Sequence, residues 1–415
     1  MGAHSERTDN GGVSTQFPLI SNGQPRRVIL IGSTGSIGTQ GLDVIDQAPE
    51  KFSVAALAGG FNLGLLARQA VKYRPALVGS AVESVDQLAA AIREAAEQAG
   101  VSGYDPQLVA GAQAATAVAG YEHADVVLNG ITGAIGLQPT VAALQAGHLL
   151  ALANKESLII GGQVVKQFAA RDQIAPVDSE HSALAQALRS GASEEVSKLV
   201  VTASGGPFFG YSYEQLREVT PAQALAHPTW DMGRVVTTNS ATMVNKALEV
   251  IEAHLLFDVP LERIEPVVHR QSIVHSMVEF IDGSVIAQAS PPDMRLPIAL
   301  GMNWPHRVAG ATKPVDFSQA ASWTFAPLDE EVFGAVKLAK QAAAASGTHM
   351  AVYNAVNEVA VDAFHDGLIR FTDIVETIAR ALDSYTPVNA EVSVEAVLET
   401  DKWARAHAKK LLEAK

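Results

Sequence analysis

Cysteine is absent from this sequence, and its absence excludes several kinds of chemistry together. Disulfide bonds, thiolate metal ligands and thiol nucleophiles are all removed. Reductases that act on acyl phosphates through a cysteine thioester are therefore excluded, even though their glycine turns look similar.

Long apolar runs and an excess of positive charge are missing as well. No stretch approaches the roughly 20 apolar residues that cross a bilayer, and residues 1–25 lack the apolar segment of a secretion signal. We expect residues 1–25 to be a flexible polar leader and the protein to be cytoplasmic, with no membrane partner. The net charge of −14 argues against binding of nucleic acid, whose phosphates need a positive surface.

The composition and the order of apolar segments predict several packed units. With 415 residues, 48% of them apolar, the chain is long enough for two or three domains. Apolar strands such as RRVILIG, FSVAALAGG and HLLALAN alternate with alanine-rich helical segments, which indicates a parallel sheet covered on both faces. Strands and helices are mixed in the middle of the chain, and its end reads as helical. We therefore expect an α/β protein with a Rossmann-like dinucleotide-binding domain at 26–177, an α+β catalytic domain at 178–302, a connector at 303–330 and a C-terminal α-helical domain at 331–415.

A glycine turn follows the first predicted strand. Gly32, Gly35 and Gly38 in GSTGSIG have GxxGxxG spacing and open a helix, so backbone N–H groups and the helix N-terminus can face a pyrophosphate. A tight turn without a ligand is the alternative. The second strand ends in Gly60-Phe61-Asn62, with no carboxylate to repel a 2′-phosphate, which favours NADP over NAD.

Two acids stand close together in PVDSEH. On an extended strand, Asp178 and Glu180 would point to the same face and converge. Oxygen ligands suit Mg²⁺ or Mn²⁺, while the nearby His181 keeps other metals possible. An exposed loop with an aspartate that caps the next helix is the alternative.

A third acid lies on a predicted amphipathic helix at 237–257. Its apolar stripe is made of Val244, Leu248, Ile251 and Leu255, and the opposite side carries Thr242, Asn245, Lys246 and Glu249. Glu249 can complete the metal site, and Asn245 and Lys246 can bind an anion beside it. We expect Ser240 at the start of this helix, where donors favour phosphate. An ordinary solvated face with a Lys246–Glu249 pair is the alternative.

Three further stretches fit an anion pocket with a lid. TASGGPF ends a strand in Ser204-Gly205-Gly206, where the backbone can approach a ligand closely. ANKESL places Lys155 and Glu156 after a strand, at the edge where such sheets bind ligands. AHPTWDMGR has the composition of a mobile lid around His227 and Trp230. A plain turn, a surface lysine and ordinary packing residues are the respective alternatives.

Taken in order, eight signatures resemble those of the 1-deoxy-D-xylulose 5-phosphate reductoisomerases from Arg27 onward: GSTGSIG, ANKESL, PVDSEH, SGGPF, HPTWDMG, SATMVNKALE, VHSM and NAVNE. The resemblance implies an enzyme of the non-mevalonate isoprenoid pathway that depends on NADPH and one divalent cation, Mg²⁺ or Mn²⁺. Such an enzyme converts its sugar phosphate substrate to 2-C-methyl-D-erythritol 4-phosphate. The resemblance also implies a homodimer.

The same resemblance implies roles for individual residues. The metal ligands are Asp178, Glu180 and Glu249, and the catalytic residues are Lys155, Glu180 and His227. Substrate contacts are implied for Lys155, Ser179, Glu180, Ser204, His227, Ser240, Asn245, Lys246 and Glu249. Cofactor contacts are implied for Thr34, Gly35, Ser36, Ile37, Gly60, Phe61, Asn62, Asn154, Glu156 and Gly233. Trp230 and Met232 belong to the flap.

The sequence departs from the family pattern at a few positions. Phe61 stands where a basic residue is common, which puts one contact to the 2′-phosphate in doubt. DSATMMNKGLE is replaced by NSATMVNKALE, without loss of an implied ligand. Arg270 in VHRQS replaces a usual proline, and we expect an altered turn there.

Two rival functions remain at this point. One is a metal-independent NADP dehydrogenase that acts on a hydroxy acid or aldehyde and keeps its activity in a chelator. The other is a regulatory module that binds NADPH without turnover.

Overall fold

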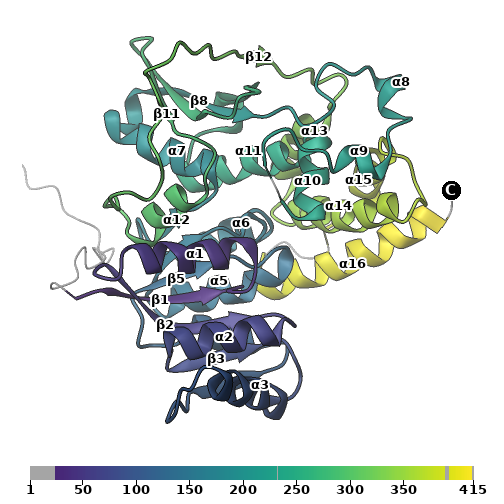
Figure 1. The fold of residues 1–415 in the computed structure, drawn as a ribbon. Coiled ribbons are helices and arrows are strands. Elements are labelled where there is room, and N and C mark those ends of the chain that lie inside the picture. The colour runs from purple at the N-terminus through teal and green to yellow at the C-terminus, as the bar shows by residue number, and fades with distance from the viewer. Residues whose placement is uncertain (1–23, 231, 388–391, 414–415) are drawn as a thin grey trace, which may run out of the picture.

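The computed structural model describes residues 24–230, 232–387 and 392–413. Nearly all of the predicted leader, residues 1–23, and Asp231 of the predicted lid lie outside the described residues. Figure 1 shows a purple N-terminal α/β layer, a second sheet on the far side of the molecule and a yellow-green group of C-terminal helices. This arrangement confirms the predicted fold class, a Rossmann-like α/β unit followed by α+β and helical parts.

The N-terminal sheet has seven parallel strands in the order β4-β3-β2-β1-β5-β6-β7. The side chains from Val28 to Ile31 in β1 are fully buried, as expected for apolar strands covered on both faces. The strands are β1 (Arg26–Ile31), β2 (Phe52–Gly59), β3 (Leu77–Ser80), β4 (Gln107–Ala110), β5 (Val126–Asn129), β6 (Leu149–Leu152) and β7 (Ile174–Pro176).

The strand order reverses direction at β1, which lies between β2 and β5. Ligands of such open sheets bind in the crevice at the carboxyl ends of the strands beside this reversal. The helices that connect these strands are α1 (Ser36–Gln47), α2 (Leu63–Tyr73), α3 (Val85–Gln98), α4 (Ala114–Ala119), α5 (Leu137–Gln145) and α6 (Lys155–Phe168).

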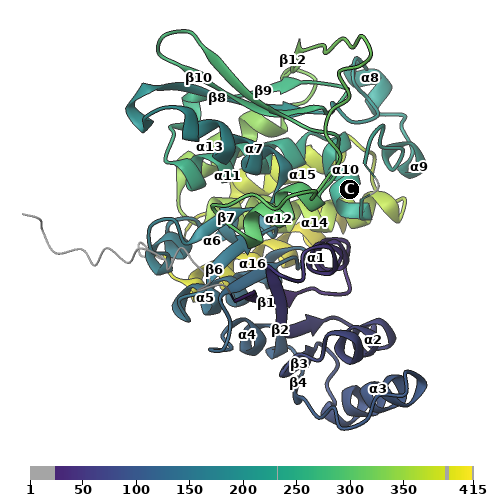
Figure 2. The ribbon, with the colours of Figure 1, turned by 60° about the vertical axis from the view of Figure 1, so that its left-hand side comes forward.

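The second sheet has five strands in the order β11-β10-β8-β9-β12. Its strands are β8 (Val196–Ala203), β9 (Ile264–Val268), β10 (Val274–Phe280), β11 (Val285–Ala289) and the short β12 (Ala326–Pro327). Figure 2 shows this sheet at the outer edge of the molecule, with helices α7 (Ser179–Ala187), α11 (Val244–Phe257) and α13 (Ala335–Ala345) on its inner side.

The helix predicted at 237–257 is in fact two helices. Helix α10 (Arg234–Ala241) ends before Met243, whose φ of 62° is left-handed, and α11 begins at Val244. Ser240 therefore lies near the end of α10 instead of at the start of a long helix. Two shorter helices, α8 (Tyr213–Leu216) and α9 (Pro221–Ala224), precede this pair.

Helix α12 (Arg295–Met302) returns to the N-terminal sheet. Ile298, Ala299 and Met302 are buried in the same apolar cluster as Leu30 and Leu128. The predicted catalytic region therefore ends with a helix that packs on the nucleotide sheet, and the domain boundaries themselves stay predictions.

The C-terminal part is helical, as predicted. Helix α14 (His349–His365) packs against α15 (Asp373–Ser384) and α16 (Val394–Glu413), and α16 also reaches α6 of the N-terminal layer. Figure 1 shows α16 in yellow along one side of the molecule. Among the described residues, no helix combines the length and the apolar character needed to span a membrane.

Candidate active site

The glycine turn has the close packing that its sequence predicts. Gly32 has a φ of 81°, and a Cβ on Gly38 would lie 2.3 Å from the carbonyl oxygen of Gly32. No side chain larger than hydrogen fits at position 38 without moving backbone. Gly35 is the N-cap of α1, and no side chain caps the first amides of the helix. This helix start is suited to a pyrophosphate.

The end of the second strand carries no acid. Phe61 is 80% exposed, and the Asn62 side chain caps α2 by accepting a hydrogen bond from the Leu65 amide at 3.2 Å. Ser80 Oγ donates to the Gly60 carbonyl at 2.8 Å and fixes the loop. Phe61 offers no charge to a 2′-phosphate at this strand end.

The three predicted metal ligands come together from two elements. Asp178 is the N-cap of α7, Glu180 lies in the first turn of α7, and Glu249 projects from α11. Their carboxylate oxygens lie within 4.8 Å of one another. The extended strand that we assumed for Asp178 and Glu180 was wrong, because β7 ends at Pro176. The two acids converge because a helix starts between them.

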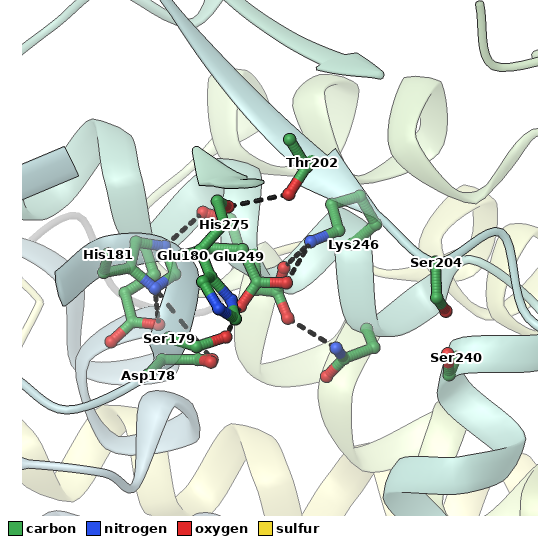
Figure 3. A network of polar contacts seen from close by, with 12 residues as sticks. Asp178, Ser179, Glu180, His181, Thr202, Ser204, Ser240, Lys246, Glu249 and His275 are labelled. Atoms are coloured by element: carbon green, nitrogen blue, oxygen red, sulfur yellow. Dashed lines mark hydrogen bonds and ion pairs between the residues drawn. The ribbon is translucent and has the colours of Figure 1, made fainter. Parts of the chain in front are cut away.

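Two lysines pair with these acids, and Figure 3 shows one of them, Lys246. Lys246 Nζ lies 2.9 Å from Glu180 Oε1 and also contacts Glu249 Oε2. Lys155 Nζ lies 3.0 Å from Glu249 Oε1 and contacts Asp178 Oδ2. Lys246 is 3% exposed and Glu249 is 1% exposed, so the solvated surface pair that we held as an alternative is excluded.

The buried charges shift one another's pKa values. Burial and the neighbouring Glu180 raise the pKa of Glu249 to about 7. Burial also acts to raise the pKa of Glu180, but the adjacent Lys246 lowers it below the usual range. The pKa values of both lysines are raised, because the carboxylates outweigh the effect of burial. At neutral pH both lysines are therefore cations.

The ligand set fits a hard divalent cation. Asp178, Glu180 and Glu249 offer only oxygen, as Mg²⁺ and Mn²⁺ prefer. His181, which kept other metals open, belongs to a second group of possible metal ligands, Asp178, His181 and Glu252, which shares Asp178 with the first group. The Nε2 of His181 donates to the Glu249 carbonyl at 2.8 Å, and its Nδ1 lies 3.1 Å from Glu252 Oε2. His181 Nδ1 also lies 3.9 Å from Asp178 Oδ2, so the group that offers oxygen ligands alone is Asp178, Glu180 and Glu249.

A hydroxyl-rich pocket lies beside the acids. His227 Nε2 lies 3.0 Å from Ser204 Oγ and 3.1 Å from Ser240 Oγ, and Figure 3 shows the two serines together at one side of the acidic group. His227 Nδ1 accepts hydrogen bonds from the backbone amides of Thr229 and Trp230, at 3.1 and 2.9 Å. The ring proton is thus on Nε2, and the serine oxygens accept it.

The same contacts keep His227 neutral. A proton on Nδ1 would face two N–H donors. Burial, and then the positive charge of Arg270, lower the pKa of His227 to about 4. Ser204 Oγ also accepts from the Gly206 amide at 3.2 Å, so its own O–H is available to a ligand. A phosphate group can use such hydroxyl donors.

One cleft of about 930 Å³ joins these parts. It is lined by the glycine turn, the acids and lysines, the serine pocket and the predicted flap. The predicted site residues in its wall are Gly35, Ser36, Ile37, Lys155, Glu156, Asp178, Ser179, Glu180, Ser204, His227, Trp230, Met232, Gly233, Ser240, Asn245, Lys246 and Glu249. Those outside its wall are Thr34, Gly60, Phe61, Asn62 and Asn154.

The comparisons with known proteins agree with this geometry. The family model described as 1-deoxy-D-xylulose 5-phosphate reductoisomerase matches residues 28–162, and two models of C-terminal domains of that enzyme match residues 174–257 and 289–407. The 1-deoxy-D-xylulose 5-phosphate reductoisomerase of Pseudarthrobacter chlorophenolicus is 64% identical over 93% of this chain and 98% of its own length. This chain belongs to the 1-deoxy-D-xylulose 5-phosphate reductoisomerase family. The resemblance in the sequence is thereby confirmed.

Other members of the family extend the comparison. The reductoisomerase of Mycobacterium avium is 55% identical, with 94% of each chain covered. A crystal structure of a family member in complex with NADPH, fosmidomycin and magnesium has a TM-score of 0.85 at 34% identity, covering 94% of this chain and 98% of that one. The Zymomonas mobilis enzyme in complex with NADPH has a TM-score of 0.85 at 38% identity, covering 94% of this chain and all of its own.

Sequence reasoning missed several residues of this reductoisomerase cleft. His275 lines it and comes from VHSM, a signature that we quoted without giving its histidine a role. Arg295 of α12 also lines it and lies 3.4 Å from Asp43 of α1, so this pair joins two sides of the cleft. No local signal marks that pair, because its members are far apart in the chain.

Proposed function

We propose that this protein converts 1-deoxy-D-xylulose 5-phosphate to 2-C-methyl-D-erythritol 4-phosphate, using NADPH and one divalent cation, Mg²⁺ or Mn²⁺. The product is a precursor in the non-mevalonate isoprenoid pathway. The observation that carries this proposal is the common cleft. It brings a dinucleotide turn, three converging carboxylates and a hydroxyl-rich anion pocket into one wall.

The acids would hold the cation. Asp178, Glu180 and Glu249 offer its ligands, and a bound cation supplies Lewis acidity toward the carbonyl and hydroxyl oxygens of the substrate. Lys155 is the first residue of α6. Its Nζ lies 3.0 Å from Glu249 Oε1 and contacts Asp178 Oδ2. There its ammonium group can donate to a substrate oxygen.

The serine pocket would hold the phosphate of the substrate. Ser204 and Ser240 keep their O–H groups for it because the ring N–H of His227 donates to their oxygens. Asn245 and Lys246 line the cleft beside them. Phosphate binding is remote from the reacting carbons, so its free energy can orient the substrate for rearrangement and reduction.

The start of α1 would hold NADPH, which supplies the hydride for reduction when it is bound. Gly35, Ser36 and Ile37 offer amides to its pyrophosphate, and Glu156 and Gly233 line the cleft further along. Trp230 and Met232 of the proposed flap lie in the same wall, where they can exclude water from the reaction.

An assay of NADPH oxidation with 1-deoxy-D-xylulose 5-phosphate tests this function. We expect the turnover to stop with EDTA and to return with Mg²⁺ or Mn²⁺. Turnover that survives the chelator would favour a metal-independent dehydrogenase. Binding of NADPH without any turnover would favour a regulatory module.

Two matched variants test the ligand roles. Asp178→Asn and Glu249→Gln remove one charge each and keep the shape of the side chain. We expect both to lose metal-dependent turnover and to bind NADPH as the wild type does, because the glycine turn is untouched. Normal activity in both variants would refute the ligand assignment.

A homodimer in the cytoplasm is part of the same proposal. On the outer side of the second sheet, Met277 lies in register between Val200 and Ala287; Met277 and Val200 are only partly buried, and Ala287 is exposed. A second copy of the chain would cover them. Light scattering should then give twice the chain mass, and Met277→Glu should shift the protein toward the monomer.

A further inference from the structure

Arg270 stands at the second position of a four-residue turn between β9 and β10. The turn is closed by a hydrogen bond from the Ser272 amide to the His269 carbonyl at 3.2 Å. Proline, which the sequence resemblance leads us to expect here, is favoured at this position of a turn. The altered turn that we expected from the sequence is therefore not needed, because the closed turn accepts either residue.

The guanidinium group of Arg270 binds the loop that follows β8. Its Nη1 donates to the Gly206 carbonyl at 2.6 Å and lies 3.3 Å from the Ser204 carbonyl. The group also lies over the ring of Phe209, 5.5 Å from the ring centroid. All three contacts are made to one short segment, and Arg270 itself does not line the cleft.

The backbone of this segment is flexible, so contacts from outside the segment are needed to keep it in one conformation. Gly205 and Gly206 have φ values of 78° and 60°, which are both left-handed. Two adjacent glycines in an unrestrained loop can adopt many other backbone conformations. A Cβ on Gly206 would lie 2.9 Å from the Ser240 carbonyl, so the loop is in close contact with α10. A shift of this loop would move Ser204 relative to Ser240 and His227.

We propose that Arg270 is a positioning residue, which holds Ser204–Gly206 in the conformation that binds the phosphate of the substrate. This inference rests on the proposed function, because that function assigns the phosphate to Ser204. Arg270 ties down the two carbonyl groups from outside the cleft, and the Ser204 hydroxyl then stays beside His227, 3.0 Å from Nε2. Its positive charge also favours an anion in the pocket, without touching it.

The test replaces the guanidinium in several ways. Arg270→Pro puts in the proline that the sequence resemblance leads us to expect and keeps the turn. Arg270→Gln removes the positive charge. Arg270→Lys keeps the positive charge but loses the planar guanidinium group. The matched control is Arg263→Gln. Arg263 Nη1 donates to the Val196 carbonyl at 2.9 Å, at the opposite end of β8 from the serine pocket.

We expect Arg270→Pro and Arg270→Gln to raise KM for 1-deoxy-D-xylulose 5-phosphate by about tenfold, the loss expected for one charged hydrogen-bonding group. The values of kcat and of KM for NADPH should stay the same, since neither the acids nor the glycine turn is touched. Arg270→Lys should fall between these variants and the wild type. The Arg263→Gln control should have wild-type constants.

Binding of inorganic phosphate, measured by calorimetry, adds a readout that needs no turnover. We expect it to weaken by the same factor in Arg270→Pro and Arg270→Gln. An unchanged KM together with unchanged phosphate binding in these variants would overturn the inference. A wild-type protein that binds phosphate but does not turn over the substrate would instead refute the proposed function. If Arg270→Gln fails to fold, Arg270→Pro still decides the question, because its turn suits proline.

Discussion

Replacing Lys246 by methionine should destabilise the protein strongly, and a divalent cation should reverse much of the loss. Above pH 7, where Glu249 is ionised, three carboxylates (Asp178, Glu180, Glu249) stand against two ammonium groups (Lys155, Lys246) in the wild type, which leaves one net negative charge. The Lys246→Met variant has two net negative charges in this group, whereas the Glu249→Gln variant has no net charge there.

The magnitude follows from burial. Removing one partner of a buried charge pair costs about 3–5 kcal/mol, and the apolar stem of methionine keeps the packing. Lys246 is 3% exposed, so we expect a loss of about 3 kcal/mol in EDTA and, for a chain of 415 residues, a fall of about 3–4 °C in Tm. Glu249→Gln should cost about 1 kcal/mol or less, because the remaining charges balance.

Thermal and urea unfolding in EDTA and in Mg²⁺ measure these differences. A cation in the acidic group replaces the missing positive charge. The difference in the free energy of unfolding between the wild type and Lys246→Met should therefore shrink in Mg²⁺ to about 1 kcal/mol. Lys72→Met is the control, because Lys72 and Asp46 form an exposed pair that should contribute less than about 1 kcal/mol. The reasoning fails if Glu249→Gln costs as much as Lys246→Met, or if Mg²⁺ leaves the gap unchanged.

Three further predictions concern other parts of the cleft. Gly38→Ala should abolish NADPH binding, measured by fluorescence titration, because its Cβ would lie 2.3 Å from the Gly32 carbonyl oxygen. Phe61→Arg should lower KM for NADPH by about fivefold, or about 1 kcal/mol, and leave that for NADH unchanged. His227 has a pKa of about 4 when folded against an ordinary 6.5, so the stability it contributes is lost as pH falls from 6.5 to 4. Urea unfolding of His227→Asn should therefore depend less on pH in that window than unfolding of the wild type.

The sequence predicted the nucleotide sheet well, because its signals are local. Strand β1 is a continuous apolar run, and each glycine that follows it stands where the backbone conformation or a close contact requires glycine. Gly38, for example, tolerates no Cβ against the Gly32 carbonyl oxygen. The acids also converge as predicted, although the reason we gave for Asp178 and Glu180 was wrong. A helix start and an extended strand both bring side chains at i and i+2 near one ligand.

The features that were missed depend on contacts across the chain. Met243 breaks the predicted helix with a left-handed φ of 62°, and neither glycine nor proline marks that position. Helical periodicity placed Lys246 and Glu249 on a polar side, but it cannot show that this side is also buried. The placement of α12 against the nucleotide sheet likewise results from packing of Ile298 and Met302. Local patterns therefore describe elements, while burial is decided by what packs on them.

The lysines imply that the acidic group is assembled before any cation enters. Lys155 and Lys246 pair with Asp178, Glu180 and Glu249, so we expect these ion pairs to keep the carboxylates together whether or not a cation is bound. An entering cation must compete with two ammonium groups for the same oxygens, which weakens its binding relative to three bare carboxylates. EDTA should therefore abolish turnover at once while the far-UV circular dichroism stays unchanged, and Mg²⁺ should restore turnover without a refolding lag. Loss of helical signal in EDTA would show that the cation, and not the lysine pairs, holds the acids in place.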